Sequence, residues 1–420
     1  MTMIRPETEM KDSGIQWLGN IPKEWSIIKG KYILKQLSRS VLESDNVVTC
    51  FRDGEVTLRS NRRELGFTNS LKEIGYQGVE PGDLVVHGMD GFAGAIGISD
   101  SRGKMSPIIN VLESGECKKY LMYYLRGLAF VNVFLGLSTG IRERSCDLRW
   151  NKLANLEYTI PPLSEQQAVA NYLDKTCSKI DEIIAEAKAS IDEYKELKQA
   201  VIFEAVTKGL DKNVEMKQCS VNWLDEIPST WESIRLKYLL TEINNRSETG
   251  TEQPLSVSQV MGVVPSYMIA VANPTASYVG QKIVEPNDIV FNKLKAHLGV
   301  FFMSKYHGLV SPDYAVYRTN DKVIPKYLEY LFHTSACISE FKKYISGVAE
   351  GLMRLYTSDL FNIRICLPKV DEQIQIVEYV ENKVELFDSL ITEKESLIND
   401  LEAYKKSLIY EVVTGKRRVV

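Results

Sequence analysis

The chain has 420 residues, of which 44% are hydrophobic and 25% are charged, a composition that predicts a folded protein of several domains with ordinary apolar cores. Its seven cysteines are scattered and form no Cys-x-x-Cys pair, which excludes a cysteine zinc site and a redox motif and favours reduced thiols in a cytoplasmic protein. The net charge of -4 excludes a uniformly basic surface, and the acidic excess lies in residues 161–215, with 7 Lys and Arg against 11 Asp and Glu, and in residues 368–420, with 8 against 11.

The first elements of the chain predict a mixed α/β domain. The amino-terminal stretch MTMIRPETEMKDSG is polar and acidic, so no secretory signal is expected. WLGNIPKEW at 17–25 is a short connector whose tryptophans are expected to anchor the incoming chain in a core. DLVVHGMDGFAGAIGISD at 83–100 is typical of a strand hairpin, in which GAIG marks turns. The apolar run 121–137 contains Arg126 in its middle, so a buried amphipathic helix is favoured over a membrane span.

The same series of motifs returns at offsets of 205 to 207 residues, which indicates an internal duplication. Because the period is far longer than that of a solenoid repeat, each copy is expected to be a domain followed by a further element. The matched pairs are WLGNIPKEW with WLDEIPSTW (223–231), PGDLVV (81–86) with PNDIVF (286–291), GKMSP (103–107) with GLVSP (308–312), KYLMYYL (119–125) with KYLEYLF (326–332), SEQQ (164–167) with DEQI (371–374), and FEAVTKG (203–209) with YEVVTGK (410–416).

The further element is predicted to be a long helix, because apolar or small residues recur every seven positions after each SEQQ or DEQI motif. A helix of about 43 residues would be roughly 65 Å long, which exceeds the width of a domain of this size and favours two paired helices over surface helices. Lys394 alone breaks the apolar stripe. The repeating positions are Leu173, Ile180, Ala187, Tyr194 and Val201 with Cys177, Ile184 and Ile191, and Val380, Phe387, Lys394, Leu401 and Leu408 with Val384, Ile391 and Ile398.

Motifs for catalysis are not found in the sequence. The four histidines have no metal-ligand spacing, and no Gly-x-Ser-x-Gly, His-Glu-x-x-His or phosphate-binding loop is present. An amino-methyltransferase would carry an Asn/Asp-Pro-Pro-aromatic loop, which NPTA at 273 and IPPL at 160 do not match. A Pro-Asp nuclease core needs a later acid-x-Lys, and PND (286–288) followed by FNK (291–293) lacks the acid. The chain is therefore predicted to be non-catalytic and to hold no metal or cofactor of its own.

Polar loops carry side chains that suit DNA. TLRSNRREL at 57–65 clusters three arginines with an asparagine, and STGIRERS at 138–145 presents two arginines after a glycine. Arginine can fork onto guanine and asparagine onto adenine, while either can hold phosphate. SVSQ (256–259), NKLKAH (292–297) and SGVAEGLMR (346–354) lie at nearly equivalent positions of the second copy. A single charge run is typical of a solvated face, but the matched positions favour DNA contact.

Almost the whole chain resembles the specificity subunit of type I restriction-modification systems, the HsdS family. The resemblance is carried by the Trp-x-x-x-Ile-Pro-x-x-Trp entries, the Pro-x-Asp-[Leu/Ile]-Val strands, the Gly-x-x-Ser-Pro turns and the Pro-x-x-x-[Glu/Asp]-Gln entry to each long helix. No single motif is specific, whereas their order, repeated in both halves, is highly specific.

The resemblance implies a mixed α+β fold with four parts. These are target-recognition domain 1 at 1–160, a central spacer helix at 161–215, target-recognition domain 2 at 216–367 and a C-terminal spacer helix at 368–420. The helices would pair as an antiparallel coiled coil, and the copies would be related by a pseudo-two-fold axis. Each domain would read one half of a bipartite site, roughly 34 to 36 Å apart on B-DNA, with the paired helices setting the unread spacer.

The resemblance also implies partners. The chain would bind double-stranded DNA, two methyltransferase subunits and, in the full enzyme, two restriction or motor subunits, in the cytoplasm and without membrane contact. S-adenosylmethionine, ATP and Mg would then belong to those partners, which agrees with the lack of catalytic motifs in this sequence.

Carried over position by position, the base-reading loops of the family fall on both copies. Tyr314 has no aromatic counterpart in the first copy, where SPIINVL places Ile109 at that position. The DNA-binding residues expected are Arg59, Asn61, Arg62, Arg63, His87, Asp90, Lys104, Arg142 and Arg144 in the first copy, and Ser258, Gln259, Lys293, Lys295, His297, Tyr314 and Arg354 in the second.

Two other functions are left open by the sequence. An autonomous nuclease or DNA methyltransferase would show activity of the purified chain with Mg²⁺ or S-adenosylmethionine. A protein-binding coiled-coil scaffold without sequence-specific DNA binding would bind DNA weakly and without the steep salt dependence that phosphate contacts produce.

Overall fold

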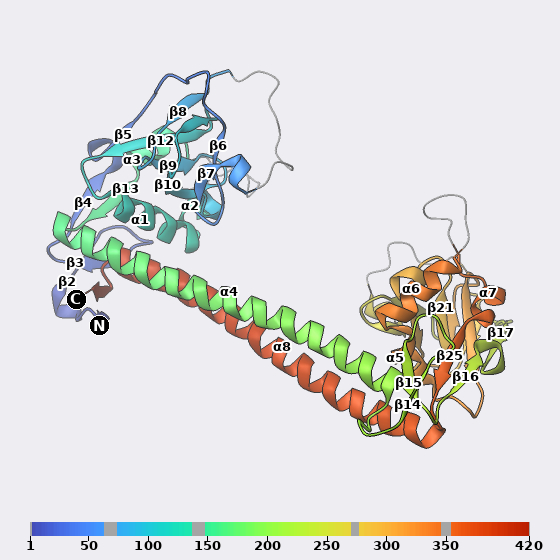
Figure 1. Ribbon diagram of the computed structural model, residues 1–420. Coiled ribbons are helices and arrows are strands. Elements are labelled where there is room, and N and C mark those ends of the chain that lie inside the picture. The colour runs from blue at the N-terminus through green and yellow to red at the C-terminus, as the bar shows by residue number, and fades with distance from the viewer. Residues whose placement is uncertain (1, 63–73, 137–147, 270–276, 346–353, 420) are drawn as a thin grey trace. The chain divides into compact units, whose positions relative to one another are not determined.

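The computed structural model describes residues 2–62, 74–136, 148–269, 277–345 and 354–419 (Figure 1). The chain divides into two compact units, residues 1–188 with 395–420 and residues 189–394. Each unit contains one copy of the duplicated domain together with a part of each long helix. No helix within the described ranges is long and apolar enough to cross a membrane.

The first copy is built around a four-stranded antiparallel sheet in the order β10-β9-β12-β5. Its central strands are buried on both faces, which is why LVV of β9 is a continuous apolar run rather than an alternating one. In β12 the run INVL is buried throughout, and the amide of its Asn110 donates to the Val86 and Leu148 carbonyls. The sheet strands are β5 (Leu34–Gln36), β9 (Leu84–His87), β10 (Ile96–Ile98) and β12 (Ile109–Ser114). The two-stranded pairs are β2 (Met10–Asp12) with β3 (Asn20–Pro22), β4 (Ser26–Lys29) with β13 (Glu157–Ile160), β6 (Val48–Cys50) with β7 (Val56–Leu58), and β8 (Gln77–Val79) with β11 (Gly103–Met105).

Within its described residues, the first copy also contains the short helices α1 (Lys118–Phe130), α2 (Val133–Gly136) and α3 (Trp150–Asn155). The predicted buried helix is α1, and it is enclosed on nearly every side, because Tyr120 to Leu125 are all buried. Arg126 remains partly exposed, and its guanidinium donates to the backbone carbonyl of Asp53 at 2.6 Å. The helix is therefore less amphipathic than the sequence pattern suggested.

The second copy repeats this topology strand for strand, which confirms the duplication. Its sheet has the order β17-β24-β21-β22, the counterpart of β5-β12-β9-β10. The sheet strands are β17 (Leu240–Ile243), β21 (Ile289–Asn292), β22 (Phe301–Met303) and β24 (Tyr314–Thr319), and the pairs are β14 (Met216–Gln218) with β15 (Glu226–Pro228), β16 (Glu232–Arg235) with β25 (Arg364–Leu367), β18 (Leu255–Ser258) with β19 (Gly262–Pro265), and β20 (Lys282–Val284) with β23 (Gly308–Val310). Its helices are α5 (Pro325–Phe332), α6 (Ser335–Lys343) and α7 (Thr357–Asn362).

The predicted long helices are α4 (Leu163–Lys208) and α8 (Val370–Val413), which lie side by side in Figure 1. In the first unit, the Lys405 amine contacts the Asp181 carboxylate at 2.6 Å. In the second unit, the ring centroids of Tyr194 and Phe387 are 6.4 Å apart. Gly209, directly after α4, lies so close to Glu372 of α8 that a Cβ atom on the glycine would be 3.0 Å from a carboxylate oxygen of Glu372. From one contact to the next, the residue numbers rise along α4 and fall along α8, so the two helices pair antiparallel, as expected.

The predicted heptad positions form the buried seam of these helices only in part. Leu173, Ile180 and Ala187 are buried, but Tyr194 and Val201 are only partly buried, and burial passes to Ile202 and Ala205 towards the end of α4. A straight helix with 3.6 residues per turn drifts away from a seven-residue repeat, which explains the change of face. Each of these helices is therefore part seam and part core element of a globular copy.

In each copy, the second tryptophan of the Trp motif is hydrogen-bonded to the glutamate of the motif that begins the long helix. Trp25 is 1% exposed, and its indole N–H donates to Glu165 at 3.0 Å. Trp231 is 0% exposed, and its indole N–H donates to Glu372 at 3.1 Å. The expected core anchoring is thus confirmed for the second tryptophan of each motif, whereas the first tryptophan of each is only partly buried.

The glutamine that follows each of those glutamates is buried and hydrogen-bonds backbone groups at the start of the long helix and at the start of the first helix of the copy. Gln166 is 0% exposed; its side-chain oxygen accepts from the Cys117 N–H at 2.9 Å, just before α1, and its amide donates to the Pro161 carbonyl at 2.9 Å. Gln373 makes the matching bonds in the second copy. These bonds satisfy backbone groups at a helix start that would otherwise be unpaired.

A buried tyrosine on the first helix of each copy reaches the end of the other long helix. The Tyr120 hydroxyl donates to the Val413 carbonyl of α8 at 3.1 Å, and the Tyr327 hydroxyl donates to the Val206 carbonyl of α4 at 2.9 Å. Each copy therefore holds the start of the long helix that follows it and the end of the other one. In the first unit, β1 (Thr2–Ile4) also pairs with β26 (Arg417–Val419). The two-fold relation between the copies stays a prediction.

Candidate nucleic-acid interface

The basic loop of the first copy lies along the β6–β7 hairpin. Arg59 and Asn61 belong to a 3-10 turn, η3 (Arg59–Asn61), directly after β7. The Arg59 guanidinium donates to the Thr49 hydroxyl at 2.8 Å, and the Asn61 amide donates to the Thr57 hydroxyl at 2.8 Å. Both side chains are therefore bonded to the hairpin, Arg59 from a partly buried position and Asn61 from an exposed one. Arg63 lies outside the described residues.

Arg62 has local acidic partners that the sequence pattern did not reveal. Its guanidinium lies 2.6 Å from an Asp53 carboxylate oxygen and 3.1 Å from one of Glu55, and it lies over the Phe51 ring at 4.4 Å. The charge is thus largely compensated in the free protein. A phosphate could bind Arg62 only by competing with these two carboxylates.

His87 and Asp90 form a turn beside the same hairpin. His87 Nδ1 accepts from the backbone N–H of Asp90 at 3.0 Å, which places the proton of the neutral ring on Nε2. Burial lowers the pKa of His87 despite the nearby Asp90 carboxylate, so the ring is neutral at neutral pH. Arg52, at the hairpin tip, donates to Asp90 at 2.8 Å and joins the two loops.

Lys104 lies on β11 next to the strand that leads into this hairpin. Its backbone N–H donates to the Asn46 carbonyl at 2.9 Å, and Lys104 forms a bridge with Val47, whose carbonyl accepts from the N–H of Arg59. The structure therefore brings Arg59, Asn61, Arg62, His87, Asp90 and Lys104 onto adjoining loops and strands of the first copy. Arg142 and Arg144 lie outside the described residues.

In the second copy, the β18–β19 hairpin and the turn after β21 are joined. The Ser258 hydroxyl accepts the backbone N–H groups of Val260 and Met261, both at 3.2 Å, and so shapes the hairpin tip. The Gln259 side-chain amide donates at 3.2 Å to the carbonyl of Leu298, the last residue of the 3-10 turn η8 (Ala296–Leu298). The predicted loops SVSQ and NKLKAH are therefore neighbours.

A buried cation network supports the same loops. The Lys282 side chain is almost fully buried, and its amine donates to the Tyr314 carbonyl at 2.8 Å. The Lys293 amine lies 3.7 Å from a Glu242 carboxylate oxygen, and Lys282 lies 4.0 Å from the same oxygen. Burial, followed by repulsion from Lys293, lowers the pKa of Lys282. Burial likewise raises the pKa of the partly buried Tyr314.

The remaining predicted residues of the second copy surround this network. Lys295 is exposed, whereas His297 and Arg354 are partly buried. Arg354 is placed next to Lys293, because the N–H of Leu355 donates to the Lys293 carbonyl at 3.1 Å. The predicted set Ser258, Gln259, Lys293, Lys295, His297, Tyr314 and Arg354 thus gathers on the loops around β21 and the β18–β19 hairpin.

His333 supports the η8 turn from the interior. Its Nδ1 lies 2.9 Å from the Glu329 carbonyl oxygen, and its Nε2 lies 3.0 Å from the Gly299 carbonyl oxygen. The ring lies against Phe301, with centroids 4.7 Å apart. Burial lowers the pKa of His333, with the Glu329 carboxylate opposing that shift. This histidine, which the sequence offered no role for, holds a predicted DNA-facing turn in place.

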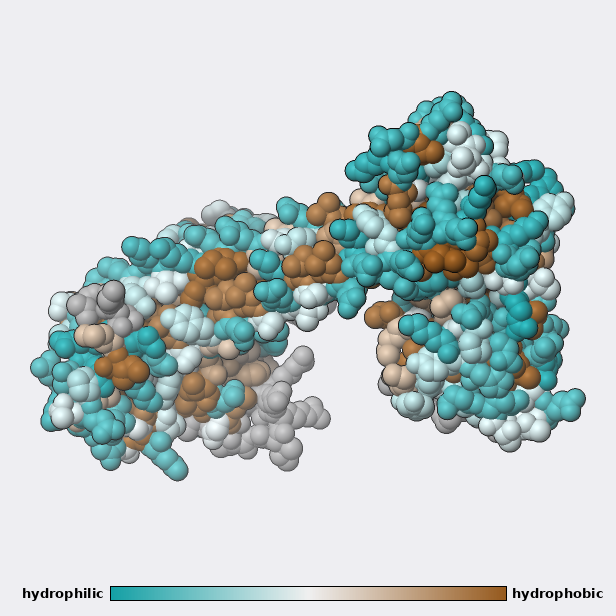
Figure 2. All heavy atoms as spheres, turned by 90° about the horizontal axis from the view of Figure 1, so that it is seen from below, coloured by the Kyte–Doolittle hydropathy of each residue, from teal (hydrophilic) through white to brown (hydrophobic). Residues whose placement is uncertain are grey.

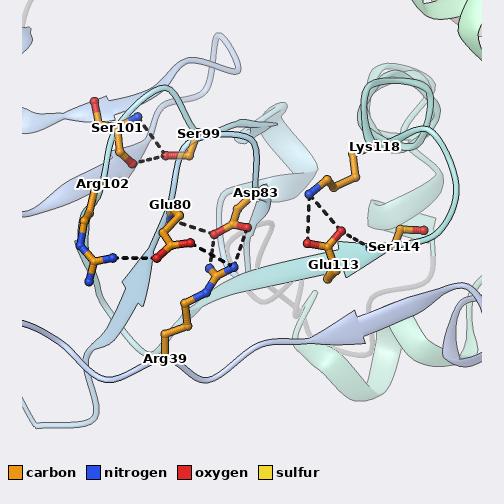
Figure 3. Close-up of polar contacts among 9 residues, drawn as sticks. All are labelled: Arg39, Glu80, Asp83, Ser99, Ser101, Arg102, Glu113, Ser114 and Lys118. Atoms are coloured by element: carbon orange, nitrogen blue, oxygen red, sulfur yellow. Dashed lines mark hydrogen bonds and ion pairs between the residues drawn. The ribbon is translucent and has the colours of Figure 1, made fainter.

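The Pro-x-Asp motif, by contrast, is structural (Figure 3). Asp83 accepts the backbone N–H of Glu80 at 2.8 Å and closes the tight turn that precedes β9. The same carboxylate receives the Arg39 guanidinium from the segment after β5, while Glu80 pairs with Arg102 at 2.7 Å. The two arginines and the two acidic residues of this turn therefore form ion pairs with one another.

The second copy builds the same corner with a different arginine. Asp288, 1% exposed, accepts the N–H of Glu285 at 2.9 Å and the guanidinium Nε of Arg318 at 2.7 Å. The residue before the aspartate has φ +88° at Gly82 and +74° at Asn287, in the left-handed region that glycine and asparagine tolerate best. This backbone requirement explains why the motif is PGD in one copy and PND in the other.

Matching the two copies by structure reveals exposed apolar residues that sequence reasoning missed. The 3-10 turn η7 (Ser266–Met268) follows β19 as η3 follows β7, so it is the counterpart of the basic Arg59–Asn61 turn. Tyr267 there is 78% exposed, and Val260 at the neighbouring hairpin tip is 92% exposed. An alignment of the copies around these strands, rather than a search for basic residues, would have found them.

Metal binding finds no support in the part of the chain that the structure describes. Within residues 2–62, 74–136, 148–269, 277–345 and 354–419, no group of three or more His, Cys, Asp or Glu side chains is placed to hold a metal ion.

Both the sequence and the fold of this chain are similar to those of type I restriction specificity proteins. Residues 228–402 match the family model of the type I restriction modification DNA specificity domain. The putative type I restriction enzyme MjaX specificity subunit of Methanocaldococcus jannaschii is 22% identical over 364 residues, covering 84% of this chain and 77% of that protein. The type I restriction enzyme EcoKI specificity subunit of Escherichia coli K12 is 21% identical over 437 residues, covering 95% and 90%.

Two solved structures share the fold. A chain from a structure on complex assembly and conformational transition of the type I R-M system has a TM-score of 0.69 at 14% identity, covering 94% of this chain and 99% of that one. The HsdS subunit from Thermoanaerobacter tengcongensis has a TM-score of 0.57 at 14% identity, covering 96% and 99%. The similarity extends over both copies and both long helices.

Proposed function

Because this chain belongs to the specificity subunits of type I restriction-modification systems, we propose that each of its two copies reads one half of a split DNA site. The observation that supports this most directly is the repeated topology. Apart from the β1–β26 pair, the strand pairs described in the first copy each have a counterpart in the second, so each copy presents an equivalent hairpin and an equivalent turn after its central strand. Two equivalent readers suit a site with two parts.

The DNA contacts are proposed to come from those hairpins and turns. In the first copy they are Arg59, Asn61, Arg62, His87, Asp90 and Lys104, together with Arg63, Arg142 and Arg144; in the second they are Ser258, Gln259, Lys293, Lys295, His297, Tyr314 and Arg354. Lysines hold phosphates as point charges, whereas arginine, asparagine and glutamine can also read base edges. The acidic partners of Arg62 suggest that it serves as a base reader only after the DNA displaces them.

The long helices are proposed to set the spacer between the half-sites and to bind two methyltransferase subunits. Figure 2 shows hydrophobic side chains at the surface along the stretch occupied by these helices. In the first unit, Ile183 is 45% and Tyr404 47% exposed; in the second, Leu197 is 51% and Leu386 50% exposed. Exposed apolar side chains that recur along a helix favour a protein interface.

Recognition is proposed to be the whole contribution of this chain, which acts in the cytoplasm on the cell's DNA. Methyl transfer with S-adenosylmethionine would be carried out by the methyltransferase subunits. In the full enzyme, two restriction subunits would supply the ATP- and Mg-dependent steps. Within this chain, residues 1–160 and 216–367 are proposed to be the two recognition domains, and residues 161–215 and 368–420 the two spacer helices.

The test is to map methylated adenines across the genome of a methylation-free bacterium that expresses this chain with its neighbouring methyltransferase subunit. A single split motif with an unread spacer is the expected result. If no new methylation is found although the complex assembles, the chain is a protein-binding scaffold instead. Activity of the purified chain alone with S-adenosylmethionine would contradict the division of labour.

A further inference from the structure

The β18–β19 hairpin of the second copy ends in an exposed apolar tip. Val260 is 92% exposed and Met261 is 48% exposed. On the neighbouring η8 turn, Leu298 is 49% exposed. Valine, methionine and leucine are usually buried, so three such residues on two joined loops indicate a surface that is covered when the protein works.

The tip is held in one shape before any partner arrives. The Ser258 hydroxyl accepts the N–H groups of both Val260 and Met261, and Gly262 follows with φ +72°, a conformation that glycine adopts without strain. The Gln259 amide ties the tip to the Leu298 carbonyl. A β-branched valine also has few side-chain rotamers, so little entropy is lost when Val260 makes a contact.

The chemistry around the tip favours DNA as its partner. Lys295, exposed on the turn that leads to Leu298, and Lys305, exposed just after β22, provide cations on the same copy. An apolar tip accompanied by cations suits a groove edged by phosphates.

The matching hairpin of the first copy has the opposite character. Its tip carries Arg52, which donates to Asp90, and Asp53, which pairs with Arg62. The same structural position is therefore charged in one copy and apolar in the other. If both hairpins face DNA, the two half-sites are read there by different chemistry.

We propose that Val260, with Leu298 on the neighbouring turn, reads the C5-methyl group of a thymine in the half-site recognised by the second copy. This inference rests on the proposed function. Val260 carries only methyl groups at its end and cannot hydrogen-bond, and the thymine methyl is the apolar group that a base pair presents in the major groove. Cytosine would remove that contact and place an amino group against an apolar side chain.

The experiment replaces each thymine of the second half-site, one at a time and on either strand, by deoxyuridine, which lacks only the methyl group. Binding of these duplexes to the complete complex with its methyltransferase subunits is measured at one fixed salt concentration. We expect one position at which uracil weakens binding about four-fold, the effect of one buried methyl group. The variant Val260→Ser binds the normal duplex about equally weakly and no longer distinguishes thymine from uracil there.

Val131→Ser is the matched control, because Val131 is an exposed valine at the end of α1 in the first copy. It retains the response to uracil in the second half-site. Absence of any uracil effect, an unchanged effect in Val260→Ser, or a half-site without thymine on either strand would overturn the proposal. Loss of methyltransferase-subunit binding in Val260→Ser would overturn it in favour of a protein contact.

A different result would mark failure of the proposed function itself. In that case, exchanging whole base pairs in the second half-site would not change binding at any position. Deoxyuridine leaves the protein untouched, so the reading of thymine is tested even if a variant were to fold poorly.

Discussion

Replacing Gln373 by leucine tests how firmly the helix-entry motif holds the second copy. The side chain is 0% exposed and makes three hydrogen bonds: it accepts from the Ile324 N–H at 2.8 Å and donates to the Lys322 and Pro368 carbonyls, both at 2.9 Å. Leucine has a similar volume but leaves these backbone groups unpaired at the start of α5 and before α8. Each buried polar group left unpaired costs about 1–3 kcal/mol, so for three groups we expect a loss of at least about 3 kcal/mol in the free energy of unfolding.

Gln375→Leu is the matched control, because Gln375 is exposed two residues further along the same helix. A surface substitution of this kind changes stability by about 0.5 kcal/mol or less. Urea unfolding followed by tryptophan fluorescence measures both variants, since Trp231 is buried at the same junction. The reasoning is refuted if Gln373→Leu destabilises the protein no more than Gln375→Leu does.

Three further predictions concern acid stability, spacing and half-chains. The pKa of His333 is lowered by burial, so as pH falls below about 6.5 the unfolded chain takes up a proton that the folded chain does not, and stability falls. His333→Gln should therefore lose up to about 1.4 kcal/mol less than wild type between pH 7.5 and 5.5 in denaturant unfolding. Adding or removing about four residues in both long helices, roughly 6 Å, should change the unread spacer of the methylated motif and leave the bases read unchanged; an unchanged spacer would contradict the ruler role. A chain ending near residue 215 should dimerise and read a symmetric site, because the Val206 carbonyl can accept from the partner's Tyr120 as Val413 does in the full chain; native mass spectrometry that finds only monomers would weaken the two-fold argument.

The duplication, the long helices and the anchoring tryptophans were predictable because they are written in periodic or repeated residues. A motif that returns at a constant offset implies the same fold twice, and a sustained seven-residue repeat implies a paired helix whatever the rest of the chain does. The identical strand order of the two copies confirms that reasoning. The drift of a straight helix against a seven-residue repeat was predictable, but the residues that become buried beyond Tyr194 were not, because Ile202 and Ala205 pack into the core of the second copy.

The candidate DNA surface was less accessible to sequence reasoning, since it depends on contacts between distant residues. Whether Arg62 is free or compensated is decided by Asp53 and Glu55, which only the hairpin brings to it. The apolar tip at Val260 has no distinguishing pattern in the sequence, and only its 92% exposure in the structure reveals it. Basic residues attract attention in a sequence, whereas exposed valine does not.

The sequence by itself determined that one folding unit is present twice and that each copy is followed by a long helix. Only the tertiary structure decided why the two motifs that mark each copy must occur together: Trp25 and Glu165, 140 residues apart, form one hydrogen bond, and Trp231 and Glu372 form its counterpart. Local periodicity specifies elements because its spacing is set by the geometry of the backbone. Contacts between elements depend on how the elements pack in three dimensions, and residue spacing along the chain does not predict that packing.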